Sequence, residues 1–270
     1  MSSHYVIAER PARRWDEATP PTFPTPGPIT IDVEPGIGDV TVVAGERADT
    51  VVAVRPTNPD DASDADAAER TTVDLTGATL TIRGPRLDPL DASDDTRSID
   101  VTVEVPAGSG IRGKSGVGDL TATGRLGDVS YWTGLGHVRV GAAATLSVTS
   151  ATGDVVVGAA GGPVRVRSAN GDITVGEAAG DVEATTPNGT IRVLDAGRGS
   201  LWLATALGGV EVGIHEGSAA WLDVETRFGV VRNELTASGP PAEPAETVEV
   251  HATTAIGDVI VRRARGRSAR

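Results

Sequence analysis

Apolar and polar residues alternate over short stretches between residues 110 and 233, and the alternation recurs at a nearly constant interval. Each stretch follows a glycine and carries two apolar residues with one residue between them. These pairs are Leu120/Ala122, Val138/Val140, Val155/Val157, Ile173/Val175, Ile191/Val193 and Val210/Val212. Strict alternation places both members of a pair on one face of a β-strand. The pattern predicts a series of short strands, each with one buried face.

A second set of alternating pairs lies between the members of the first set. These pairs are Val129/Tyr131, Leu146/Val148, Val164/Val166, Val182/Ala184, Leu201/Leu203 and Leu222/Val224. The residues between the paired positions are mostly polar, and a shift of register by one residue would bury their charges. Each repeat therefore holds two strands and two turns, and we call this unit a rung.

A short phrase marks each rung: a serine or threonine, two further residues and a glycine. Copies begin at Ser115, Thr133, Ser150, Ser168, Thr186, Thr205, Thr226 and, after a longer gap, Thr254. The glycines of the first seven copies lie 17 to 21 residues apart. A period in this range is typical of proteins whose repeats bury their apolar faces on their neighbours. We predict an all-β fold, a parallel two-sheet β-solenoid with about 18 residues per rung.

Glycine and aspartate dominate the predicted turns. Glycine adopts positive φ at no steric cost, and Asn-Gly pairs favour turns. Aspartate directly follows glycine at Asp119, Asp128, Asp154, Asp172, Asp181 and Asp258. A short carboxylate at such a position can accept hydrogen bonds from backbone N–H groups of the turn. The alternative is calcium between rungs, but each turn offers one carboxylate and calcium takes six to eight oxygen ligands. We expect no metal and no cofactor.

Composition changes along the chain and suggests four parts. Residues 1–28 form a flexible Pro-rich extension, residues 29–109 a β-rich region that caps the solenoid, residues 110–263 the repeat region, and residues 264–270 a basic tail. A Pro-rich excursion interrupts the repeats at 234–246. The residue before the phrase glycine is apolar near both ends of the repeat region, and we expect loops of the end regions to cover these positions: Val117, Leu135, Leu207, Phe228 and Ile256.

Four segments together resemble a known family. They are Val103–Gly108, Ala219–Asp223, Phe228–Asn233 and Ile256–Val261, and they flank or interrupt the Gly-Asp-apolar repeat. The combination resembles the bacterial β-strand-repeat family labelled "putative adhesin", a domain of unknown function, over about residues 22–263. The richness in Ala, Gly, Arg and Asp suggests an actinobacterial version. The resemblance implies a β-solenoid and no established activity, so no functional residues carry over from it.

Charge and composition limit the classes of partner. The chain of 270 residues has a formal net charge of −13 and a pI near 4.7, which argues against general affinity for nucleic acid or anionic lipid. It contains no cysteine, which excludes disulfides and thiolate metal sites. The first residues hold an apolar run of four residues, far too short for a secretory signal. No segment is apolar enough to insert into a membrane. We expect a cytoplasmic protein.

No catalytic constellation stands out. The histidines, at 4, 137, 215 and 251, are far apart, and no Ser nucleophile elbow, phosphate loop or dinucleotide fingerprint is present. Outward charges such as Glu183, Glu211 and Asp223 are what any solvated sheet would carry. Sugar sites need aromatic platforms, and the repeats offer three tryptophans: Trp132, Trp202 and Trp221. We therefore predict that the protein is not an enzyme.

The outward residues suggest a role in binding. Alternation turns Trp202 outward between Leu201 and Leu203, and an exposed tryptophan on a regular sheet can anchor a partner. Cover by the 234–246 segment is the alternative for Trp202. With Arg192 and Val156, it forms our set of candidate partner-binding residues. We predict a non-enzymatic scaffold that binds a protein partner or associates with itself through its sheet faces. A carbohydrate-binding or carbohydrate-active β-helix is the alternative.

Overall fold

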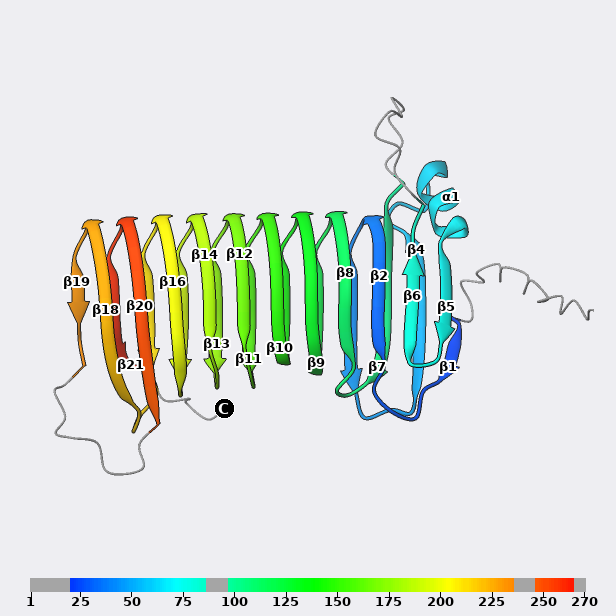
Figure 1. Ribbon diagram of the computed structural model, residues 1–270. Helices are drawn as coiled ribbons and strands as arrows, with labels where there is room; N and C mark the ends of the chain where they lie inside the picture. Colours follow the sequence, from blue (N-terminus) through cyan, green and yellow to red (C-terminus); the bar gives the residue numbers. More distant parts are fainter. Residues whose placement is uncertain (1–19, 86–96, 236–245, 265–270) are drawn as a thin grey trace, which may run out of the picture.

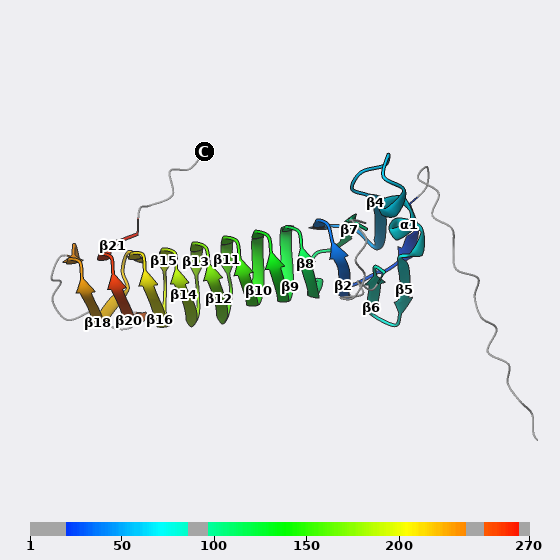
Figure 2. The same ribbon diagram turned by 90° about the horizontal axis from the view of Figure 1, so that it is seen from above.

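The computed structural model describes residues 20–85, 97–235 and 246–264, which hold 21 strands and one helix (Figure 1). The fold is all-β, as the sequence predicts, with nearly all strands joined in one large multi-stranded arrangement. The predicted Pro-rich extension, the Pro-rich excursion and the basic tail lie largely outside the described residues. Within those residues the strands form two long rows that face each other along a rod (Figure 2).

The first row extends over the whole rod. In spatial order it contains β5 (Thr72–Thr76), β6 (Thr79–Arg83), β2 (Thr30–Ile37), β8 (Gly110–Val117), the second half of β9 (Leu120–Leu135), the second half of β10 (Val138–Thr152), β12 (Val164–Asn170), β14 (Val182–Asn188), β16 (Gly199–Leu207), β20 (Thr247–Ile256) and β18 (Ala219–Phe228). All pairs in this row are parallel except β5 with β6.

The second row lies opposite the first. In spatial order it contains β1 (Thr22–Pro24), β4 (Asp49–Pro56), β7 (Ile99–Pro106), β3 (Val40–Gly45), the first halves of β9 and β10, β11 (Val155–Ala160), β13 (Ile173–Ala178), β15 (Ile191–Ala196), β17 (Val210–Ile214), β21 (Val259–Arg263) and β19 (Val231–Asn233). Because β9 and β10 run through both rows, they join the two rows at the edge where the chain turns.

The core lies between the rows, and the predicted apolar pairs line it. Val155, Ile173 and Ile191 stack in register on neighbouring strands, and each is fully buried. Full burial of such a side chain stabilises the fold by about 1.5–3 kcal/mol, so every rung adds several such contributions. Leu222 and Val224 are the exception, because they are half-buried at the end of the rod.

Close contact with the neighbouring rung, more than turn conformation, requires glycine in the repeated phrase. Gly171 has φ of +146°, and a Cβ atom there would lie 2.2 Å from the carbonyl oxygen of Gly153 in the neighbouring rung. The phrase hydroxyl has a matching role, since the Oγ1 of Thr186 donates to the carbonyl oxygen of Gly171 at 3.1 Å. Thr205 donates in the same way to Gly189 at 2.8 Å. The two ends of the phrase therefore connect adjacent rungs.

The turn aspartates also connect rungs. Asp154 Oδ1 accepts from the backbone N–H of Asp172 at 2.9 Å, and Asp172 Oδ1 accepts from that of Thr190 at 2.8 Å. The sequence predicts acceptance from the turn itself, whereas here the donor belongs to the next rung. Burial alone would raise the pKa of Asp172, but the Thr190 N–H and the Arg192 guanidinium outweigh it and lower the pKa. The carboxylates are thus occupied by structural hydrogen bonds.

The order of rungs in space departs from their order in sequence at both ends. The β20/β21 rung lies between the β16/β17 and β18/β19 rungs, as the colour order in Figure 1 shows. The β2/β3 rung likewise lies between β6/β7 and β8/β9. Residues 247–261 come last in the sequence, yet β18 and β19 form the end of the rod.

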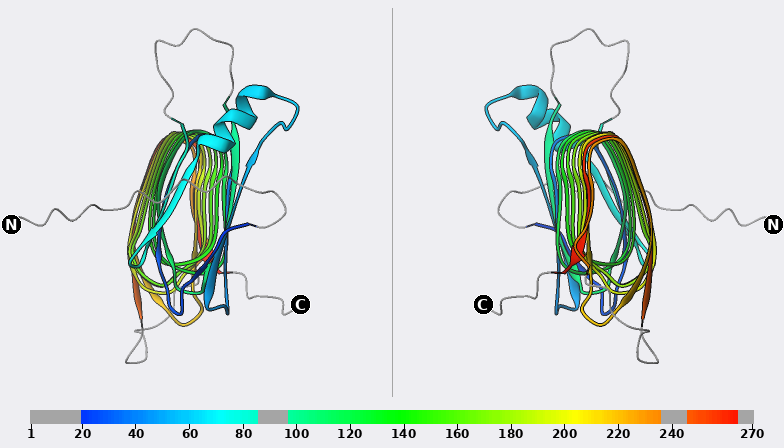
Figure 3. Two further views of the ribbon diagram at one scale, coloured as in Figure 1. Left: turned by 90° about the vertical axis from the view of Figure 1, so that its right-hand side faces the viewer. Right: turned by 90° about the vertical axis from the view of Figure 1, so that its left-hand side faces the viewer.

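The α1 helix (Ala62–Arg70) covers the other end (Figure 3). Asp61 caps its first turn by accepting from the Ser63 N–H at 2.8 Å, which satisfies a donor that the helix leaves free. Its inner face packs Ala67 and Ala68 into the same core. The buried Asp64 accepts from the backbone N–H of Ser98 at 2.7 Å and so links the helix to the start of β7. The helix therefore covers part of the core at the β4/β7 end.

Candidate functional site

The outer face of the first row carries an aromatic cluster near the β18 end of the rod. It comprises Trp202 on β16, His251 on β20 and Trp221 on β18, and we call it the aromatic ridge. Trp202 and His251 are cross-strand partners, and their rings stack with centroids 3.9 Å apart and planes 10° apart. The Trp221 ring lies 5.3 Å from the His251 ring and is tilted by 56°. The three rings therefore form one continuous group across three strands.

His251 holds the ridge in place. Its Nδ1 lies 3.3 Å from Asp223 Oδ2, and its Nε2 lies 3.2 Å from Glu249 Oε1. Carboxylates are acceptors, so a ring nitrogen that carries a proton can donate to its carboxylate neighbour. The second Glu249 oxygen accepts from Ser200 Oγ at 3.3 Å. Hydrogen bonding and stacking together fix the orientation of the histidine.

The two tryptophans of the ridge remain open to solvent. Trp202 is 57% exposed and Trp221 is 53% exposed, whereas the His251 side chain is 17% exposed. No described segment covers Trp202, and the 234–246 segment, the alternative cover, lies largely outside the described residues. Isolated exposed apolar residues are ordinary in proteins, but two tryptophans on either side of a half-buried histidine are a defined surface feature.

A shallow hollow of about 540 Å³ borders the ridge on the β14 side. Trp202 forms one wall, and Arg165, Asp181, Glu183 and Ser200 contribute polar groups to it. Arg165 Nε donates to Glu183 Oε2 at 2.7 Å, and this hydrogen bond lowers the pKa of Glu183. Arg167 contacts the other oxygen of the same carboxylate. The charge of Glu183 is thus balanced beside the open face of Trp202.

The structure separates the predicted candidate residues. Trp202 lies in the first row, whereas Arg192 on β15 and Val156 on β11 lie in the second row. Val156 is 41% exposed, and Thr174 separates it from Arg192 in register. Arg192 Nη1 donates to Asp172 Oδ2 at 3.0 Å, so it is engaged within its own face. The three residues do not form one surface, and the ridge contains Trp202 without the other two.

Sequence reasoning missed His251 and its two acceptors. It set His251 aside because the four histidines are far apart in sequence, and His251 also lies 49 positions after Trp202. The two become neighbours only because β20 lies between β16 and β18. The outward register of Trp221, two residues before Asp223, is visible in the sequence and was the available signal.

A second apolar feature follows the edge where each rung turns. Leu207, Ile256 and Phe228 are register neighbours there and are 51%, 52% and 72% exposed. Val117 and Leu135 form a smaller group toward the other end, 42% and 51% exposed. We expected loops to cover these five positions, but no described loop covers them, and their side chains are exposed to solvent.

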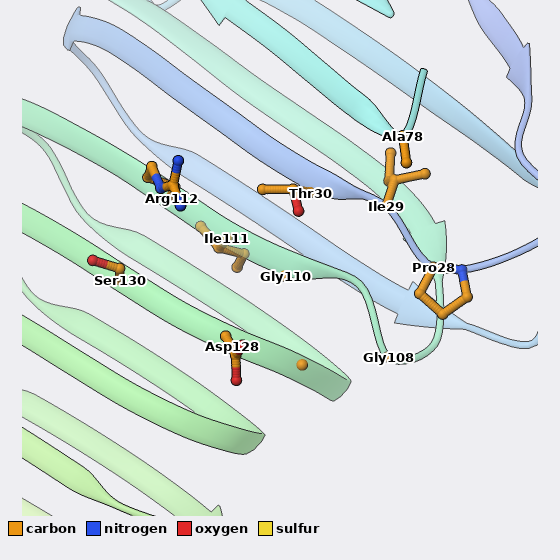
Figure 4. A pocket seen from close by; sticks show the side chains of 11 residues that line it. Pro28, Ile29, Thr30, Ala78, Gly108, Gly110, Ile111, Arg112, Asp128 and Ser130 are labelled. Carbon is orange, nitrogen blue, oxygen red and sulfur yellow. The ribbon is translucent and has the colours of Figure 1, made fainter. Parts of the chain in front are cut away.

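Another hollow, of about 360 Å³, lies where β2 meets β8 (Figure 4). Pro28, Ile29, Gly108 and Gly110 line much of it, and Arg112 is its cation. Its carboxylate, Asp128, accepts from Thr145 Oγ1 at 2.6 Å. This lining offers little side-chain chemistry compared with the aromatic ridge.

The described ranges contain no group of three or more His, Asp or Glu side chains placed to hold a metal ion. In the same ranges no helix is both long and apolar enough to cross a bilayer.

Comparison with known proteins gives structural neighbours but no relatives in sequence. No protein-family model matches the sequence, and no curated protein matches it. A putative adhesin from Bacteroides fragilis has a TM-score of 0.47 at 16% identity, over 89% of this chain and 95% of that chain. A putative adhesin from Parabacteroides distasonis has a TM-score of 0.38 at 12% identity, over 90% and 96%. A putative cell adhesion protein from Clostridium sporogenes has a TM-score of 0.31 at 11% identity, over 91% and 100%.

The names of these structures match the label of the family that the sequence resembles. At such low identities and TM-scores the similarity carries no argument about activity, ligand or location. The comparisons also give no support to an actinobacterial type.

Proposed function

We propose that the protein is a non-enzymatic interaction protein, a β-solenoid scaffold that binds a protein partner through the aromatic ridge. One observation carries the proposal: Trp202 and Trp221 are each more than half exposed, while His251 between them is held by two carboxylates. Tryptophan is enriched among the residues that dominate binding energy. A side chain already fixed before binding loses less conformational freedom when the partner arrives.

The charges around the ridge support binding rather than catalysis. A glycosidase site of the usual kind needs a carboxylic acid kept protonated by a raised pKa. Glu183, beside the ridge, has a lowered pKa because Arg165 donates to it. The other carboxyl groups whose pKa shifts in the described ranges, Asp49, Asp61 and Asp172, also shift downward. A carboxyl group with a lowered pKa has already lost its proton near neutral pH, so these groups are unsuited to act as general acids.

Carbohydrate is the second candidate ligand, and the hollow beside Trp202 favours it. One face of Trp202 stacks on His251, and the other faces the β14 side, where Glu183 is its register partner. An open aromatic face next to Arg165, Asp181 and Ser200 suits a sugar ring. The apolar face of the sugar would stack on the tryptophan, and the polar side chains would hydrogen-bond the sugar hydroxyls. Because arginines balance Glu183, the hollow suits a neutral ligand better than a cation.

Single-site variants test the proposal. The wild-type protein, Trp202→Ala and Trp132→Ala are immobilised and exposed to lysate, and captured proteins are quantified and then titrated. Trp132 is a matched control, because it lies on the same row at 46% exposure but away from the ridge. Loss of an anchor tryptophan should weaken partner binding by roughly 30-fold or more, and Trp132→Ala should leave it unchanged.

Two results would redirect the proposal. A partner bound equally by wild type and Trp202→Ala would exclude the ridge, and loss in a separate Arg192→Glu variant would then place binding on the second row. Binding of one glycan class in a broad panel, abolished by Trp202→Ala, with no protein captured would establish the carbohydrate alternative.

A further inference from the structure

The β18/β19 rung leaves one end of the core open. Leu222 and Val224 face the core from β18 but remain half-buried, and Val231 on β19 is 42% exposed. The equivalent residues one rung inward, Val250 and Val259, are fully buried. Figure 3 (right) looks along the rod at this end, where β18 and β19 are the outermost described elements.

Backbone groups at this end also lack partners in the described part of the chain. The ten-residue strand β18 pairs with β20 on one side, and β19 pairs with β21 on one side. Alternate N–H and C=O groups on their outer edges therefore point away from the rod. A long exposed edge of this kind is a template for another strand. A second strand edge satisfies these donors and acceptors and also covers the apolar residues.

The opposite end does not offer a matching surface. There α1 packs Ala67 and Ala68 into the core, and the rows finish in reversed strands, the five-residue β5 and the three-residue β1. Head-to-tail stacking of copies would require a long parallel edge at that end. Stacking through the β18/β19 rung therefore brings a second copy tail to tail, which gives a closed dimer instead of a filament.

The charges on the two edge strands decide between the possible two-fold axes. Glu225 points outward from β18 four residues before the turn glycine Gly229, and Arg232 points outward from β19 three residues after it. The two therefore lie at a similar height on opposite rows. An axis parallel to the strands keeps each residue at its height and places β18 beside the partner copy's β19. Glu225 then faces the partner copy's arginine twice. An axis perpendicular to the rows would instead place β18 beside the partner copy's β18, so that Glu225 and Arg232 would not meet.

We propose that two copies of this chain pair through the β18/β19 rung, with the two-fold axis parallel to the strands and reciprocal contacts between Glu225 and Arg232. Successive strands of a rung run in opposite directions, so β18 and the partner copy's β19 run antiparallel. The dimer continues both rows across the axis and buries Val224 and Val231 at its centre. This inference is independent of the aromatic ridge.

Reciprocal charge reversal tests the proposal in the full-length protein. Sedimentation velocity over a range of concentrations should show a dimer for the wild type. Arg232→Glu and Glu225→Arg should each weaken the dimer by at least about tenfold, because each opposes like charges at two equivalent places. The combined variant should restore it. Arg139→Glu makes the same charge change on an outer face in the middle of the rod and should have no effect.

Several results would overturn the proposal. They are a wild-type protein that is monomeric at every concentration, single variants that dimerise like the wild type, and a combined variant no better than the single ones. Dimer lost in Trp202→Ala would place the contact on the ridge instead and would equally refute pairing through β18 and β19. Circular dichroism of each variant verifies that it is folded.

Discussion

Substitution of Gly171 by alanine tests whether adjacent rungs are packed so closely that only glycine fits. Gly171 has φ of +146°, and the new Cβ would lie 2.2 Å from the carbonyl oxygen of Gly153 and 2.6 Å from its carbonyl carbon. Both contacts are to backbone, so no side-chain rotation relieves them. The rungs must move apart, which strains hydrogen bonds such as that from the Gly171 N–H to the Asn188 carbonyl oxygen at 2.9 Å.

Two other glycines separate the conformational cost of positive φ from the cost of the backbone clash. Gly77 has φ of +61° with no atom within 4 Å of its Cβ position, so Gly77→Ala carries the conformational cost alone, about 1 kcal/mol. Gly161 is not in a positive-φ conformation, and its nearest contact is 3.9 Å, so Gly161→Ala should stabilise by about 0.4–1 kcal/mol. Gly171→Ala adds the backbone clash and two or three weakened hydrogen bonds, about 3–5 kcal/mol in total.

Urea unfolding followed by circular dichroism gives the three free energies. For a slope near 3 kcal/mol/M, Gly171→Ala should lower the midpoint by about 1–1.7 M, and Gly161→Ala should raise it slightly. If Gly171→Ala cost no more than Gly77→Ala, the contact with Gly153 would not limit the residue at this position. The explanation of the repeated glycine would then reduce to turn conformation.

Further predictions concern the buried Ser and Thr hydroxyls of the repeated phrase and the turn aspartates that connect rungs. Thr133 Oγ1 is fully buried without a hydrogen-bond partner in the described ranges, so Thr133→Val should raise the unfolding free energy by about 1 kcal/mol, measured in urea. Thr186→Val, at an equally buried hydroxyl that donates to a backbone carbonyl, should lower it by about 1 kcal/mol; equal effects would contradict the assignment. The pKa of Asp172 is lowered from 3.8, so its charge stabilises the fold above that pH, and this contribution is lost as pH falls below it. Asp172→Asn should therefore be less stable than wild type at pH 7 and should lose less stability between pH 7 and pH 3, and parallel losses would refute this.

The local structure of the rod could be predicted from alternation because alternation has a direct physical cause. A strand with one buried face must repeat every two residues, so the register of pairs such as Val164/Val166 followed from the sequence and is confirmed by their burial. The role of the phrase glycines was predicted in part. Positive φ is a local property, whereas contact with the carbonyl of the next rung depends on how closely rungs stack.

The order of rungs at the two ends could not be predicted. A strand such as β20 carries the same alternating pattern whether it lies inside the rod or at its end, because its inner face is apolar in both cases. What distinguishes the positions is the neighbour, and the segments between residues 233 and 247 do not specify it through any pattern of apolar residues.

The candidate site depended on that same order. Trp202 was predicted to face outward because alternation sets its direction. His251 and Trp221 could not be placed beside it, since their proximity requires β20 to separate β16 from β18. Arg192 and Val156 were assigned to faces by the same alternation, but no sequence pattern states which outward residues a partner contacts.

The position of β20 and β21 inside the rod has a consequence for chain length. These two strands are the sole row neighbours of β18 and β19 within the described residues. A chain that ended near residue 246 would lack β20 and β21. The strands β18 and β19 would then have no neighbouring strand to pair with. Premature termination there would cost the fold four strands, so residues 247–263 determine whether about twice their own length, residues 219–233 together with 247–263, is ordered.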